Sequence, residues 1–195
     1  MAQKEIREFF DSLAEGWDKG NQPLGEVTLR LLKQLGIKEG DEVLDLACGR
    51  GVITGALHEL SKADVLGVDL SPKMIEGAKE DYKGKKGIEF RCLDFLNEDL
   101  GRKFDYVVCY NAYPHFLDAS EFARRVASVL KEGGRFAILH SFGMEGLNAH
   151  HKHTADTVSR MLKNPSEESE SFEPYFEILV AESGDDHYAI LGRLK

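Results

Sequence analysis

The fold of this chain is decided by the stretch Val43-Leu44-Asp45-Leu46-Ala47-Cys48-Gly49-Arg50-Gly51. A short apolar run, typical of a buried strand, ends there in a tight Gly-x-Gly turn, and Val52–Leu60 follows with helical apolar spacing. In α/β proteins, a strand, a glycine-containing turn and a helix form the floor of a site for a nucleotide-like ligand, because the turn's open backbone permits close approach. We therefore expect residues 43–60 to contact such a ligand.

Strand-like runs alternate with helix-like segments on both sides of this stretch. The expected strands are Glu42–Ala47, Val65–Asp69, Ile88–Leu93, Phe104–Tyr110 and Arg135–His140, and the expected helices are Val52–Leu60, Ser71–Tyr82 and Phe122–Leu130. This alternation predicts βαβ crossovers and a mostly parallel sheet. Two further runs, Tyr175–Ala181 and His187–Leu194, flank a polar turn and predict an antiparallel hairpin. The predicted fold is therefore α/β: a Rossmann-like, doubly wound, mostly parallel seven-stranded sheet with a C-terminal antiparallel hairpin.

We expect one domain over residues 1–195, with four parts. Residues 1–40 are predicted to be helical with interruptions, and residues 41–140 form the ligand-binding core. Residues 141–173 are expected to hold a loop, a helix near Asn148–Leu162 and the exposed acidic loop Ser166–Ser171, and residues 174–195 form the closing hairpin.

Composition excludes several classes of function. The net charge of -9, without a long Lys/Arg run, disfavours a nucleic-acid partner. No apolar stretch approaches the roughly 20 residues that span a bilayer, and Met1–Glu8 lacks the apolar core of a signal peptide. The cysteines Cys48, Cys92 and Cys109 are widely spaced, which indicates neither a disulfide framework nor a CxxC metal site. We expect a cytoplasmic protein; the sequence does not indicate its oligomeric state.

Asp45 discriminates between two kinds of cofactor. The spacing Gly49-x-Gly51-x-x-Thr54 lacks the third glycine of the dinucleotide motif, which makes that match weak. A pyrophosphate at this helix N-terminus would also be repelled by the nearby carboxylate of Asp45. S-adenosylmethionine carries an ammonium and a sulfonium and no phosphate, so the same carboxylate would attract it.

The stretch Asp45–Gly51 resembles the first motif of class I S-adenosylmethionine-dependent methyltransferases, and further motifs follow in the expected order. The resemblance implies that Asp69 accepts hydrogen bonds from the ribose hydroxyls, that Asp94 meets the adenine amino group and that Phe95 packs on the adenine ring. The segment from Phe9 to Asp18 resembles the lid helix of small-molecule methyltransferases related to quinone biosynthesis. The cofactor-binding residues implied in this way are Trp17, Asp45, Ala47, Cys48, Gly49, Gly51, Asp69, Leu70, Met74, Asp94, Phe95, Tyr110 and Asn111.

Each acid also has a structural interpretation: Asp45 as a turn cap, Asp69 as an acid before a helix, Asp94 as a loop acid. Three acids at the ends of successive strands favour a ligand site, because open parallel sheets bind ligands at those ends. For Trp17, cofactor contact and core packing remain equal alternatives. The three cysteines are interpreted as inert rather than as nucleophiles.

Methyl transfer requires an aligned acceptor and, where needed, a base. The candidates are His115 and His140 as bases and Tyr113 as an orienting or wall residue, with a structural role open for each. A second cluster, His150, His151 and His153, with His140 could contact a metal or an acidic substrate, but a polar loop is favoured and no metal is expected.

The predicted function is transfer of a methyl group from S-adenosylmethionine to a small-molecule acceptor whose identity the sequence leaves open. One alternative is a nicotinamide-dependent oxidoreductase, which Asp45 and the missing glycine disfavour. Another is a non-catalytic S-adenosylmethionine-binding regulatory module, which would keep Asp45, Asp69 and Asp94 but offer no acceptor pocket.

Overall fold

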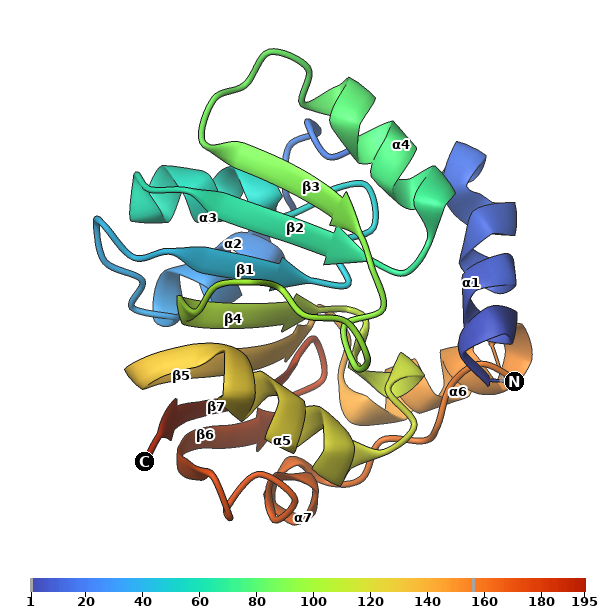
Figure 1. Ribbon diagram of the computed structural model, residues 1–195. Helices are drawn as coiled ribbons and strands as arrows, with labels where there is room; N and C mark the ends of the chain where they lie inside the picture. The colour runs from blue at the N-terminus through green and yellow to red at the C-terminus, as the bar shows by residue number, and fades with distance from the viewer. Residues whose placement is uncertain (1, 156) are drawn as a thin grey trace.

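A computed structural model describes residues 2–155 and 157–195 as a single sheet covered by helices on both faces (Figure 1). The sheet order is β3-β2-β1-β4-β5-β7-β6; β7 runs antiparallel to both β5 and β6, and the other described strand pairs are parallel. The predicted fold class is therefore confirmed. The strands are β1 (Val43–Leu46), β2 (Val65–Asp69), β3 (Ile88–Cys92), β4 (Phe104–Tyr110), β5 (Leu130–His140), β6 (Phe176–Ser183) and β7 (Tyr188–Leu194).

Seven α-helices and two short 3-10 helices are described. Figure 1 shows α1 and α6 beyond the arrowheads of β1 to β4, at the carboxyl edge of the sheet where the chain reverses strand order. That edge is where open α/β sheets bind ligands. The α-helices are α1 (Ala2–Leu13), α2 (Glu26–Gln34), α3 (Thr54–Ser61), α4 (Pro72–Asp81), α5 (Ala119–Val129), α6 (Met144–Thr154) and α7 (Pro165–Ser169); the 3-10 helices are η1 (Ala14–Gly16) and η2 (Tyr113–His115).

The central strands are buried on both faces, with side chains alternating between two cores. In β5, Phe136 and Ile138 pack toward α5, whereas Ala137 and Leu139 pack toward α2 and α3. Burial on both faces explains why the strands read as continuous apolar runs in the sequence.

The segment after β5 differs from the expectation in two places. A helix was predicted near Asn148–Leu162, but α6 begins earlier, at Met144, and ends at Thr154. Beyond α6, the backbone N–H of Arg160 donates a hydrogen bond to the carbonyl of Pro114 in η2, so it is not available for a continuing helix. The predicted exposed loop Ser166–Ser171 contains α7, capped by the side chain of Asn164, and Glu168 within it is buried. The helix before β5 ends at Val129, and the Gly133-Gly134 pair lies inside β5 rather than before it.

Candidate active site

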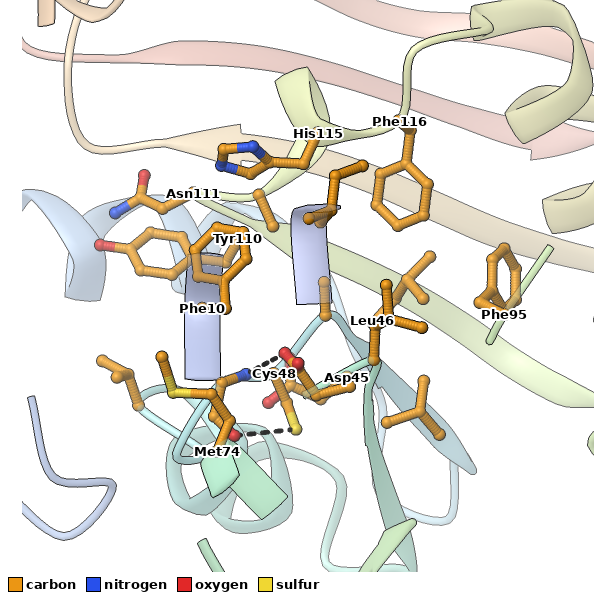
Figure 2. Close-up of a pocket in the computed structure, with 18 of the residues that line it drawn as sticks. Phe10, Asp45, Leu46, Cys48, Met74, Phe95, Tyr110, Asn111, His115 and Phe116 are labelled. Carbon is orange, nitrogen blue, oxygen red and sulfur yellow. Dashed lines mark hydrogen bonds between the residues drawn. The ribbon is translucent and has the colours of Figure 1, made fainter. Parts of the chain in front are cut away.

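A cavity of about 310 Å³ lies at the carboxyl ends of β1, β2 and β4, beneath α1 (Figure 2). Twelve of the thirteen predicted cofactor-binding residues line it, as does His115. The exception is Gly51. A side chain on Gly51 would meet the rings of Phe90 and Tyr82, so this glycine serves the packing of the turn rather than the cavity wall.

The turn after β1 brings its backbone close to the cavity. Ala47 and Gly49 have positive φ angles of 55° and 54°, which turn the chain sharply at the end of the strand. A Cβ on Gly49 would lie 3.2 Å from Nε1 of Trp17. Glycine is therefore needed here both for conformation and because the Trp17 indole packs directly on the turn. Burial raises the pKa of the Cys48 thiol well above its usual value, which fits an inert thiol.

Asp45 is the most deeply buried acid of the cavity, with 1% of its surface exposed. The hydroxyl of Thr54 donates a hydrogen bond to its Oδ2 at 2.5 Å. Burial raises the pKa of Asp45 to about 7, in spite of this hydrogen bond. The threonine at the position of the missing third glycine thus holds the carboxyl in place, a role that the motif comparison did not predict.

Asp69 ends β2 and accepts backbone hydrogen bonds on both oxygens, from the N–H of Gly49 and of Ser71, each at 2.8 Å. Burial raises its pKa to about 6, against the effect of these bonds. The Ser71 hydroxyl donates to Asp11 of α1 at 2.6 Å. Asp69 is thus fixed between the glycine turn and the lid helix, with its carboxyl at the cavity wall.

Asp94 has the hydrogen bonds expected of a loop acid and also a place on the cavity wall, and its contact with adenine stays a prediction. It accepts hydrogen bonds from the backbone N–H of Leu96 and the side-chain amide of Asn97, as a loop acid does, and it also lines the cavity. Phe95 beside it is buried and lies with its ring under the guanidinium of Arg125. The side chains of Asp94 and Phe95 are therefore both held in place by contacts within the protein.

The lid segment, residues 2–20, closes the cavity from the N-terminal side. Gln3, Ile6 and Phe10 share one face of α1 and line the cavity, and Phe10 makes edge contacts with Trp17 at 5.8 Å and with His115 at 4.8 Å between ring centroids. Trp17 therefore packs on Phe10 and also lines the cavity, and its contact with a cofactor stays a prediction.

The far end of the lid segment is held by Arg50, Asp81 and Tyr82, which we call the anchor cluster. Arg50 forms a two-point ion pair with Asp81 at 2.9 and 2.8 Å and reaches the carbonyl of Ala14 at 3.4 Å. The Tyr82 hydroxyl lies 2.5 Å from the carbonyl oxygen of Gly20 and 2.7 Å from that of Gly51. Tyr82 thereby connects the lid segment, at Gly20, to the glycine turn after β1, at Gly51.

The ends of β4 and β5 are joined across the cavity mouth. The Asn111 side chain donates to the Ser141 hydroxyl at 3.1 Å and accepts from the Ser141 N–H at 3.0 Å. Asn111 has a φ of 52°, a conformation that asparagine tolerates better than most residues. Figure 2 shows Asn111 and His115 on the same side of the cavity, opposite Asp45 and Met74.

The three predicted catalytic residues lie in different surroundings. His115 lines the cavity, and its Nδ1 lies 3.0 Å from the carbonyl oxygen of Val158. Tyr113 and His140 are fully buried and do not line the cavity. The Tyr113 hydroxyl donates to Glu168 at 2.8 Å, and burial raises its pKa far above the usual value. His140 packs edge-on against Tyr188 at 5.8 Å.

The second histidine cluster falls partly outside the described residues, because the side chains of His151 and His153 are not described. Within the part of the chain that is described, no group of three or more His, Cys, Asp or Glu side chains is arranged to hold a metal ion. Nor does any described helix combine the length and apolarity needed to cross a membrane.

Sequence reasoning missed the cavity wall contributed by Phe116 and Phe142, and it missed Thr54, Val158, Arg160 and Glu168 around it. Phe142 directly follows the strand-end pair His140-Ser141, so its position after β5 was the available signal. The remaining residues depend on contacts between distant segments.

Acidic side chains line the cavity without any described basic lysine or arginine among them. Its described lining residues include the carboxylates of Asp18, Asp45, Asp69 and Asp94, and neither lysine nor arginine is among them. The nearby Arg50 is committed to Asp81. A pyrophosphate would find no cationic partner on this wall.

Comparison with known proteins gives the family. A methyltransferase domain model matches residues 37–182. The chain is 32% identical over 109 residues to the putative methyltransferase 235L of Invertebrate iridescent virus 6, covering 55% of this chain and 40% of that protein. It is 30% identical over 141 residues to the ubiquinone biosynthesis O-methyltransferase of Coxiella burnetii (strain Dugway 5J108-111), covering 68% of this chain and 59% of that protein. The chain thus spans about half the length of these curated relatives.

A solved structure shares the fold over nearly the whole chain. It is a putative methyltransferase in complex with the Haloferax volcanii Trm112 methyltransferase activator, with a TM-score of 0.77 at 21% identity, covering 95% of this chain and 97% of that one. The strand order, the acids at the strand ends and the match over residues 37–182 agree. This chain therefore belongs to the class I S-adenosylmethionine-dependent methyltransferase domain family.

Proposed function

We propose that this protein transfers a methyl group from S-adenosylmethionine to a small acceptor that carries no negative charge. The observation that carries the proposal is the placement of Asp45, Asp69 and Asp94 around one cavity that has carboxylates and no described Lys or Arg in its wall. When bound, S-adenosylmethionine supplies a methyl group already activated on a sulfonium. Its two cationic groups and its lack of phosphate fit this wall.

In the proposed complex each acid has one task. Asp45 faces the cationic methionine end, because it is the buried acid beside the glycine turn. Asp69 accepts hydrogen bonds from the ribose hydroxyls, because each of its oxygens keeps a lone pair beyond the one used by a backbone N–H. Asp94 and Phe95 take the adenine edge and ring, and Trp17 covers the ligand from the lid side.

The residues at the proposed acceptor end of the cavity favour an uncharged small molecule as the methyl acceptor. Its polar groups are the amide of Asn111, the hydroxyl of Ser141 and the imidazole of His115, and its walls are aromatic, from Phe116 and Phe142. A carboxylate or phosphate buried there would meet neither lysine nor arginine among the described lining residues, and an unpaired buried charge costs several kcal/mol. The small-molecule character also has support from the Coxiella burnetii relative, whose name places it in ubiquinone biosynthesis.

His115 is the proposed base for acceptors that must lose a proton, because of the three predicted catalytic residues it alone lines the cavity. Asn111 and Ser141 orient the acceptor through the polar bridge that they form between β4 and β5. Tyr113 and His140 support the cavity from behind its wall. Alignment of the acceptor supplies much of the rate, since the methyl group needs no further activation.

Calorimetry tests the donor half: S-adenosylhomocysteine is expected to bind, and NADH is not. Tight NADH binding without S-adenosylhomocysteine binding would refute the proposal in favour of an oxidoreductase. The acceptor half is tested by mass-spectrometric detection of S-adenosylhomocysteine formed with phenols, amines and thiols, each in a neutral and a carboxylate-bearing version. Turnover confined to the carboxylate versions would contradict the charge argument, and binding without turnover by any compound would favour the regulatory module.

A further inference from the structure

A buried ion pair lies behind the cavity, and neither of its two residues lines the cavity wall. Arg160 donates to Glu168 through Nη2 at 2.7 Å and through Nη1 at 3.1 Å, and only 2% of the Glu168 side chain is exposed. Buried ion pairs contribute little net stability, because desolvation offsets their attraction. Stability alone is therefore a weak reason for this pair.

The ion pair is attached to η2, the turn that carries His115. The Arg160 Nε donates to the carbonyl of Phe116 at 3.0 Å, and the Arg160 backbone N–H donates to the carbonyl of Pro114, also at 3.0 Å. From the other side, the Tyr113 hydroxyl donates to Glu168 at 2.8 Å. Tyr113 and Phe116 are therefore bonded to the two charged groups, and Pro114 is bonded to the backbone of Arg160.

The same segment also contacts the His115 ring. Nδ1 of His115 lies 3.0 Å from the carbonyl oxygen of Val158, two residues before Arg160. A carbonyl oxygen only accepts hydrogen bonds, so Nδ1 must carry the hydrogen in this contact. In the neutral ring, Nε2 is then the nitrogen with the lone pair.

We propose that Arg160, paired with Glu168, is a positioning residue that locks η2 against residues 158–160 and thereby keeps His115 in the Nδ1–H tautomer. This tautomer presents Nε2 as the proton-accepting atom. The inference rests on the proposed function insofar as His115 acts as the base. Its structural content does not depend on that function: the tautomer rests on the contact between His115 and the Val158 carbonyl, and the positioning of η2 rests on the contacts of Arg160.

The experiment measures the ring ¹⁵N chemical shifts of His115 in the full-length protein, assigned with His115→Gln, at a pH where the ring is neutral. The wild type is expected to show the Nδ1–H pattern. Arg160→Met is expected to lose the dominance of that pattern, and Arg160→Lys to restore it only in part, because lysine cannot reach both Glu168 and the Phe116 carbonyl. Arg193→Met is the matched control, since it removes an exposed ion pair with Glu177.

An unchanged Nδ1–H pattern in Arg160→Met overturns the proposal, as does an Nε2–H pattern in the wild type. If Arg160→Met does not fold, Arg160→Met with Glu168→Met removes both charges and leaves neither buried alone; the same loss is expected. S-adenosylhomocysteine binding is measured for each variant and should not change. If the wild type does not bind it, the proposed function fails, whereas the tautomer measurement needs no cofactor and still decides this inference.

Discussion

The buried carboxyl of Asp45 makes cofactor affinity depend on pH near neutrality. Burial raises its pKa to about 7, whereas a bound cationic ligand favours the ionised form. Affinity is therefore full above the pKa and falls as the carboxyl becomes protonated. At about pH 6 roughly one carboxyl in ten is ionised, so the apparent Kd should be about tenfold higher than at about pH 8, which corresponds to about 1.4 kcal/mol.

Titration calorimetry with S-adenosylhomocysteine at several pH values measures this effect, and buffers with different ionisation enthalpies report the proton released on binding. Asp45→Asn is the matched variant, because asparagine keeps the size of the side chain and an oxygen for the Thr54 hydroxyl. The ligand's own amine titrates equally with both proteins. The difference between wild type and variant therefore isolates Asp45.

The expected outcome is that Asp45→Asn binds more weakly throughout and that its apparent Kd changes about tenfold less than that of the wild type between about pH 6 and about pH 8, since Asp69, with a pKa of about 6, titrates in both proteins. Equal pH profiles for the two proteins would refute the reasoning, since the carboxyl would then not titrate in this range. Equal affinity at about pH 8 would refute the assignment of Asp45 to the cationic end of the ligand.

Three further predictions follow from the structure. In the cofactor-free protein, the Asp45 carboxyl ionises at lower pH in the unfolded chain than in the folded one. Its raised pKa should therefore lower the free energy of unfolding by about 1.4 kcal/mol per pH unit as pH rises from about 4 to about 7. Urea unfolding of Asp45→Asn should lack this contribution. Gly20→Ala would place a Cβ 2.3 Å from the Arg50 carbonyl oxygen, so it should cost about 1 to 3 kcal/mol and change Trp17 fluorescence; Gly16→Ala, with open space around it, should do neither. His115→Gln should lower turnover and leave calorimetric S-adenosylhomocysteine affinity unchanged, and an unaltered rate would limit catalysis to positioning.

The fold and the donor end of the site were predictable because local patterns determine them. Apolar runs specified the strands, and the acids at their ends necessarily meet at one edge of a parallel sheet. Asp45 and Asp69 therefore reach the cavity by topology alone, as predicted. Gly51, predicted to bind the cofactor, does not line the cavity and packs instead against Phe90 of β3 and Tyr82 at the end of α4, contacts that a local motif does not reveal.

The region after β5 was harder to predict because its structure depends on long-range contacts. Ser166–Ser171 has the acidic, serine-rich composition of an exposed loop. Glu168 nevertheless becomes buried, since Arg160 and Tyr113 supply its hydrogen bonds. The side chain of Tyr113 was likewise considered for the pocket, but its hydroxyl turns to Glu168. Only the three-dimensional meeting of these segments determines where each side chain points.

The anchor cluster has a consequence for protein engineering and for the divergence of relatives. Arg50 and Tyr82 connect the lid segment to the glycine turn, while the family match begins only at residue 37. The lid is therefore not a freely transferable module: a chimera that exchanges residues 2–20 alone must place its backbone carbonyls opposite Arg50 and Tyr82 and must keep glycine at position 20, where a Cβ would lie 2.3 Å from the Tyr82 ring. Grafting another enzyme's lid onto this scaffold would require exchanging both sides of the joint together. Substitutions at Gly20 and Tyr82 should then accumulate as correlated pairs.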